Sequence, residues 1–173
     1  PPPSQPYSLN NYGSSDYLNS CNSTGLSIPT NVFGNQTTLD GNAYAGILLI
    51  VNTTTDFVNE KEYIEVELTQ SLEYDKIYCC EFYYSTAEYY NEPYFPNIRI
   101  GMLLTDTIVG RAHGVGTGQP QAIWATPQVW DTLPKNKDTI NWIKVSGHFR
   151  AKGGERFLTI GNFQDEDTTY TKS

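Results

Sequence analysis

The chain has 173 residues and a net charge of −8, and only 17% of its residues are charged. It is long enough for one domain with a sizeable core, and its acidic balance excludes a basic surface for nucleic acid. No run of about 18 apolar residues is present, so no membrane-spanning segment is expected.

Residues 1–42 are punctuated by Pro, Ser, Asn and Gly, which predicts a loop-rich segment packed on the domain. The core domain is expected in residues 43–165, followed by a tail in residues 166–173. Short apolar or alternating segments of the core predict strands at 43–51, 62–68, 77–85, 97–104, 121–130, 139–150 and 157–163. No long segment has a helical period with caps. We therefore expect a single all-β domain, an antiparallel sandwich or barrel.

The alternation within these segments predicts which side chains face the core. Residues 62–68 place Ile64, Val66 and Leu68 on one face and Tyr63, Glu65 and Glu67 on the other, and residues 77–85 place Tyr78, Cys80, Phe82 and Tyr84 on one face. Pro127 interrupts its segment, which predicts an edge strand. Gly147 predicts a bulge or a close approach between strands.

The stretch "AKGGERFLTIGNF", residues 151–163, joins the last two predicted strands. Gly153 and Gly154 are expected to adopt turn conformations that other residues resist, with Leu158 and Ile160 facing the core. The alternative is a binding loop in which Glu155 contacts a ligand.

Known catalytic patterns are absent from the sequence, so no enzyme activity is expected. His113 and His148 are far apart, and His148 falls on the polar face of a strand. Glu65 and Glu67 could in principle form the carboxylate pair of a glycosidase, but alternating carboxylates on a strand usually serve solubility. The glycine-rich segment 110–120 lacks the Lys-Ser/Thr ending of a phosphate loop and is expected to be a rim loop.

The three cysteines do not form a disulfide framework, and no Cys/His spacing typical of zinc is present. Cys79 and Cys80 are adjacent in a predicted strand, so they point to opposite faces and are poor partners for each other. Cys80 is expected in the core. Cys21 lies in a polar loop and is a candidate for a disulfide with a cysteine outside this sequence.

Aromatic residues gather in the segments "YYSTAEYYNEPYF" and "IWATPQVW". Sugar rings stack on aromatic faces, so Trp124, Trp130, Tyr89 and Tyr90 are the candidate ligand-binding residues. The alternative is that these side chains fill the core or a protein interface, where Tyr and Trp are also common.

Several phrases, in this order, resemble a β-sandwich module of Bacteroidetes cell-surface proteins. They are "SSDYLNSC", "SIPTNVFGNQTTLDGNAYAGI", "EYIEVEL", "YCCEFYYS" and "NWIKVSGHFRAKGGERFLTIGNF", and they cover roughly residues 14–165. Such modules resemble the galactose-binding-like jelly roll of many carbohydrate-binding modules. They are often joined to an OmpA-like domain or a type IX secretion C-terminal domain.

The resemblance implies an extracellular location on the outer membrane exterior. No cofactor is expected, and the resemblance offers only a structural calcium as a candidate, whose ligands it does not assign in this chain. The terminal strands of the family are missing, so the chain is expected to be trimmed at both ends. The upstream segment of the family often carries a cysteine, a natural partner for Cys21.

Asp-Thr-hydrophobic and Asp-Thr-Thr triplets resemble the O-glycosylation sequons of Bacteroidetes envelope proteins. They predict O-glycans on Thr107, Thr132, Thr139 and Thr168. Together these features predict a non-catalytic surface module for adhesion or assembly, with another surface protein or a glycan as its partner. A carbohydrate-binding module is the alternative.

Overall fold

The structure is a computed structural model, and it describes residues 7–8, 15–22, 25–49, 61–89, 98–109, 122–131 and 138–164. These residues form antiparallel β-strands and no helix, which confirms the predicted all-β class. Within them, accordingly, no helix has the length and apolar character that a membrane crossing requires.

Two of the described strands are eight residues long, and the others are shorter. They are β1 (Tyr7–Ser8), β2 (Asp16–Asn19), β3 (Thr30–Asn31), β4 (Gly34–Asn35), β5 (Ala43–Gly46), β6 (Tyr63–Glu67), β7 (Ile77–Tyr84), β8 (Gly101–Thr105), β9 (Val129–Trp130), β10 (Ile143–Arg150) and β11 (Phe157–Gly161).

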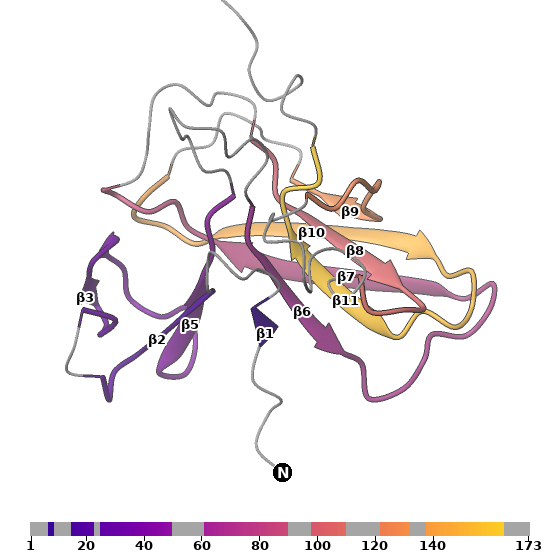
Figure 1. Ribbon diagram of the computed structural model, residues 1–173, viewed down its shortest axis with the longest axis horizontal. Coiled ribbons are helices and arrows are strands. Elements are labelled where there is room, and N and C mark those ends of the chain that lie inside the picture. The colour runs from indigo at the N-terminus through magenta and orange to yellow at the C-terminus, as the bar shows by residue number, and fades with distance from the viewer. Residues whose placement is uncertain are drawn as a thin grey trace, which may run out of the picture.

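The largest sheet contains five strands in the order β1-β6-β11-β8-β9, with β11 between β6 and β8 (Figure 1). Leu158 of β11 pairs with Val66 of β6 on one side and with Leu104 of β8 on the other. β9 is an edge strand of this sheet, as the interruption at Pro127 predicted.

The five-stranded sheet is buried on both faces. On one face, Met102 and Leu104 of β8 pack with Val145 of β10, and half-buried side chains of β7 and β10 complete this cluster. On the opposite face, Leu103 packs with Tyr63 in a second cluster. Because successive residues of a strand point to opposite faces, β8 is apolar without alternation.

The second buried face corrects the expectation for residues 62–68. The alternation places Tyr63 and Glu65 on the more polar face of the strand, yet both are buried, and Glu65 is only 5% exposed. The alternation had separated the two faces correctly, but it cannot reveal that further chain covers the more polar one. Glu67, on the same face, is exposed as predicted.

β7 and β10 form a separate two-stranded ladder that packs against the first of these faces. Cys80, Phe82 and Tyr84 point into the cluster, as their alternation predicted. The ladder is continuous, so Gly147 is not a bulge. It is a close approach instead, because a Cβ there would lie 3.1 Å from Val129 Cγ2 of β9.

Two loops at one end of the sheets are joined through their backbones. The N–H of Leu72 donates to the carbonyl of Glu155 (2.8 Å), and the N–H of Gly154 donates to the carbonyl of Leu72 (2.9 Å). Gly153 and Gly154 have φ values of 86° and 92°, in the left-handed region, which confirms their predicted turn role.

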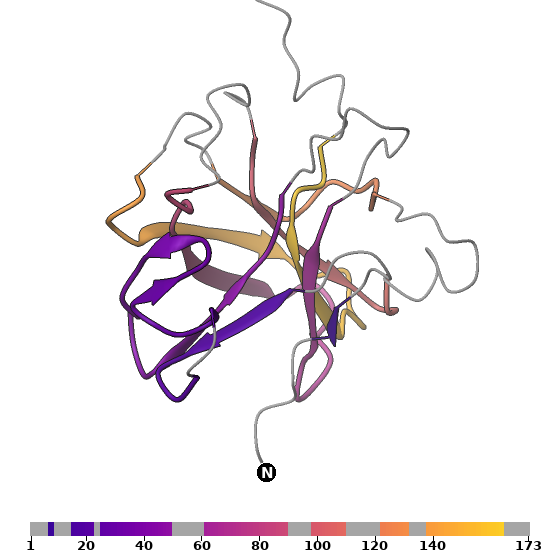
Figure 2. The ribbon, with the colours of Figure 1, turned by 60° about the vertical axis from the view of Figure 1, so that its left-hand side comes forward.

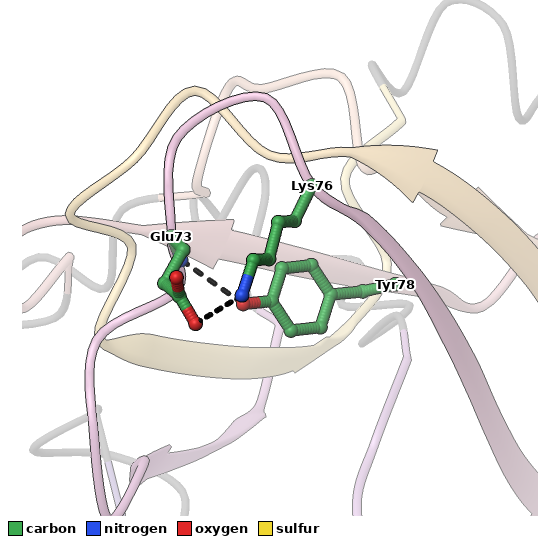
Figure 3. Close-up of polar contacts among 3 residues, drawn as sticks. All are labelled: Glu73, Lys76 and Tyr78. Carbon is green, nitrogen blue, oxygen red and sulfur yellow. Dashed lines mark hydrogen bonds and ion pairs between the residues drawn. The ribbon is translucent and has the colours of Figure 1, made fainter.

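The loop before β7 is closed by contacts of Glu73 (Figure 3). Lys76 Nζ lies 2.6 Å from Glu73 Oε1, and the N–H of Glu73 donates to the Tyr78 hydroxyl (3.0 Å). The hydrogen bond to Glu73 raises the pKa of Lys76. Since both charged groups are exposed, the pair orders the loop and contributes little to stability.

The segment predicted as loop contains short strands as well. β2 pairs with β5, and β3 pairs with β4 across a tight turn. Leu18 of β2 is completely buried. The indole N–H of Trp142 donates to the carbonyl of Thr37 (2.8 Å), so the segment after β4 lies next to the N-terminal end of β10. The strand expected at 43–51 forms only over Ala43–Gly46, because residues 47–49 are not in a strand, and residues 50–51 lie outside the described residues.

Candidate functional site

The aromatic residues predicted to bind a ligand do not form one patch. Trp124 is 56% exposed and lies near β9, where Trp130 is half-buried. Tyr89 is 67% exposed, and its N–H donates to the carbonyl of Phe33, between β3 and β4. β9 and the β3–β4 pair lie on opposite sides of the molecule (Figures 1 and 2). Tyr90 lies outside the described residues.

Trp124 and Trp130 have different environments. Lys61, which is 1% exposed, places its Nζ 5.7 Å from the ring centroid of Trp124 and donates a hydrogen bond to the carbonyl of Gln164. Arg99 lies over Trp130, whose ring packs on the cluster of Tyr63 and its neighbours. Trp130 is therefore a packing residue, whereas Trp124 presents ring surface to solvent.

The outward side of the β7–β10 ladder is an extended exposed surface, here named the outer ladder face. It consists of Ile77, Cys79, Glu81 and Tyr83 of β7 and Lys144, Ser146, His148 and Arg150 of β10. Every one of these residues is exposed, because the alternate residues of both strands point into the core.

Charged and aromatic groups are matched across this face. Lys144 Nζ lies 2.6 Å from Glu81 Oε2 and 5.8 Å from the ring centroid of Tyr83. Arg150 forms an ion pair of 2.9 Å with Asp75 in the loop before β7. The face therefore combines fixed charges with exposed apolar surface from Ile77 and Tyr83.

The sequence identified the polar residues of both strands but not their pairing. His148 was correctly expected on a solvated face. Its position opposite Cys79 follows from the register of the ladder. Only a prediction of which residue of 77–85 faces which residue of 139–150 could have found this arrangement.

The buried carboxylates serve as hydrogen-bond acceptors within the fold. Glu65 Oε2 accepts from the Thr159 hydroxyl (3.0 Å) and from the N–H of Val109 (3.1 Å). The expectation that Glu65 is a solubilising surface carboxylate was therefore wrong. Glu155 Oε1 accepts from the N–H of Lys152 (2.7 Å), which favours a role within the turn rather than in ligand contact.

The buried carboxylate of Asp131 accepts a 2.6 Å hydrogen bond from the Tyr84 hydroxyl. Burial, together with the bond to Asp131 and its charge, raises the pKa of Tyr84. Tyr63 is similar: burial raises its pKa to about 12 although the N–H of Ile123 donates to it. Both phenols are neutral at physiological pH and act as hydrogen-bonding core residues.

Two partly buried carboxylates, Asp16 of β2 and Glu62 just before β6, act on each other electrostatically. Burial raises the pKa of Glu62. The hydrogen bond from the N–H of Leu48 lowers this pKa in part, and the charge of Asp16 raises it. Burial also raises the pKa of Asp16. Glu62 Oε2 accepts from Leu48 at 2.7 Å, so this carboxylate is held by the backbone.

Glu62→Gln should stabilise the protein at pH 7. The raised pKa means that the folded state holds the Glu62 proton more tightly than the unfolded chain does. The stabilising contribution of the bound proton is complete when the pH is below 4.5, the ordinary pKa of a Glu side chain. It is lost as the pH rises through the raised pKa of Glu62 in the folded state. The amide oxygen of Gln can still accept from Leu48. Urea unfolding between pH 4 and 8 should show the advantage of the variant growing with pH, and an advantage that shrinks with pH would contradict this assignment.

The remaining predicted site residues are only partly described. Cys21 and Cys79 are exposed and Cys80 is half-buried, and none forms a disulfide with another described residue. Thr107 is exposed and Thr139 is half-exposed, whereas Thr132 and Thr168 lie outside the described residues. Among the residues that the structure describes, no group of three or more His, Cys, Asp or Glu could hold a metal ion. The disulfide, the O-glycans and the calcium remain predictions.

Comparison with known proteins adds no assignment. No protein-family model matches the chain, and neither the curated proteins nor the solved structures contain a match to it.

Proposed function

We propose that the chain is a non-catalytic extracellular module that serves adhesion or assembly through protein contacts at the outer ladder face. The observation that carries the proposal is the exposure of eight residues, paired by strand register, on one continuous ladder. Tyr and Arg, both present here, are enriched at protein interfaces, and protein interfaces are no more apolar overall than other protein surface.

The strand edges support the same function. Among the described strands, β7 and β10 pair only with each other. An unpaired edge offers backbone N–H and C=O groups to an added strand, which is a common mode of peptide recognition. A partner can therefore bind the ladder through its side chains and its edge together.

The finer fold and location belong to this proposal. A two-stranded ladder packed on a five-stranded sheet is compatible with a jelly-roll β-sandwich. The resemblance to Bacteroidetes surface modules supports a position on the outer membrane exterior, within a larger assembly of surface proteins. Of the two candidate threonines that the structure describes, Thr107 is the exposed one and the better placed for O-glycosylation.

Removing the apolar side chains of the outer ladder face should weaken assembly. Ile77→Ser combined with Tyr83→Ser should cost about 2 kcal/mol of binding, roughly thirtyfold in affinity, if the two side chains lie at the centre of the contact. The measurement is the fraction of full-length protein in its native complex, separated by native electrophoresis of the producing cells.

A matched control is Val32→Ser combined with Leu39→Ser. These side chains are similarly exposed but lie in and after the β3–β4 pair. The control should leave the complex intact, and melting temperatures should show that both double variants remain folded. Equal loss of the complex in the two variants would contradict a specific role of the ladder.

A carbohydrate-binding module is the second candidate, and the exposed ring of Trp124 favours it. Trp124→Ala should then abolish glycan-array binding and cost about 1 kcal/mol of stability or less, since it removes an exposed ring and one cation–π contact. Trp130→Ala should cost about 2 kcal/mol because its half-buried ring supports the core. Glycan binding that survives Trp124→Ala would exclude this site.

A further inference from the structure

Cys79 and His148 lie directly opposite each other on the outer ladder face. They are register partners in the antiparallel pairing of β7 and β10, and both are exposed. The neighbouring register pair, Glu81 and Ser146, points the same way, since the Glu81 carboxylate meets Lys144 on this face. A thiol and an imidazole therefore lie side by side on a continuous ladder, exposed to solvent.

This pairing has the chemistry and the reach of a metal-binding pair. Thiolate and imidazole are the preferred protein ligands of Zn²⁺, with bonds of about 2.3 Å to sulfur and about 2.0–2.1 Å to nitrogen. Opposite residues of an antiparallel ladder have Cβ atoms about 4.5–5.5 Å apart, so one ion can reach both side chains from above the sheet.

We propose that Cys79 and His148 bind a thiophilic cation such as Zn²⁺, with solvent in the remaining coordination positions. The thiol proton is released to solvent when the sulfur coordinates the ion, and no redox change is involved. Among the described residues no third Cys, His, Asp or Glu completes the site, so the protein supplies two ligands and solvent the others. The inference does not depend on the proposed protein contact.

The experiment uses the full-length protein, kept reduced, with Co²⁺ as a spectroscopic probe and Zn²⁺ as its competitor. Thiolate ligation should give a sulfur-to-cobalt charge-transfer band that Zn²⁺ abolishes. Cys79→Ser should remove this band. His148→Ala should weaken Co²⁺ binding by about tenfold or more, because the loss of a direct ligand should cost at least as much as the loss of a second-shell partner.

The controls use the other candidate ligands of the chain. Cys21→Ser removes the other exposed thiol among the described residues, and His113→Ala changes the only other histidine of this sequence. Both should leave the band and the affinity unchanged, and melting temperatures should confirm that all variants fold. A band that persists in Cys79→Ser, or an affinity unaffected by His148→Ala, would overturn the proposal.

Discussion

Tyr63→Ala should lower the free energy of unfolding by about 4 kcal/mol, the range expected when a large buried aromatic is truncated. Tyr63 is 1% exposed, and its ring lies 5.4 Å from that of Phe163 between centroids. Its hydroxyl donates to the carbonyl of Asn162 (2.9 Å) and accepts from the N–H of Ile123 (3.1 Å). The ring thus ties β6 to the segments before β9 and after β11.

Tyr63→Phe separates packing from hydrogen bonding. It keeps the ring but leaves two buried backbone groups without their partner, which should cost about 1–3 kcal/mol. Chemical denaturation of both variants measures the difference. If alanine cost no more than phenylalanine, the ring would not be a core element and the second buried face of the sheet would be in error.

Gly153→Ala should cost about 3 kcal/mol, considerably more than Gly154→Ala. Both glycines have similar positive φ, so alanine meets backbone strain of about 1–2 kcal/mol at either position. Only at Gly153 would the new Cβ also lie 2.9 Å from Tyr74 Cβ and 3.1 Å from Tyr74 Cα, whereas at Gly154 it meets open space. Overpacking adds about 1–3 kcal/mol.

The comparison is internally matched, because the two residues are adjacent in one turn. The midpoint of urea unfolding should fall in both variants and further in Gly153→Ala. Equal effects would show that the loop before β7 does not lie against Gly153, and that the joining of the two loops is wrong.

The strands with clear alternation could be predicted from the sequence. Which of their side chains point to the core was predictable only in part. Cys80 and Phe82 alternate with exposed residues because the ladder has one buried side. Glu65 could not be placed, because its burial depends on Thr159 and Val109, which are distant in the chain. The very short strands β3 and β4 contain Asn and Gly, which have low strand propensity, so no pattern indicated them.

The candidate site was predictable only in residue type. Trp124 and Trp130 occupy one segment and look alike in sequence, yet the packing of Trp130 on the core makes one structural and leaves the other exposed. Cys79 and His148 come together through strand pairing between segments far apart in the chain. Composition and spacing carry no information about that register.

The central claim, that the outer ladder face contacts a protein partner, can be tested most directly by site-specific photo-crosslinking in the producing cells. A photoreactive amino acid replaces Tyr83 in one strain and Val32 in another, two exposed positions on different parts of the fold. The account predicts one covalent adduct of defined mass from position 83, lost when Ile77→Asp is added, and none from position 32. Adducts of equal yield from both positions, or none from position 83, would contradict it.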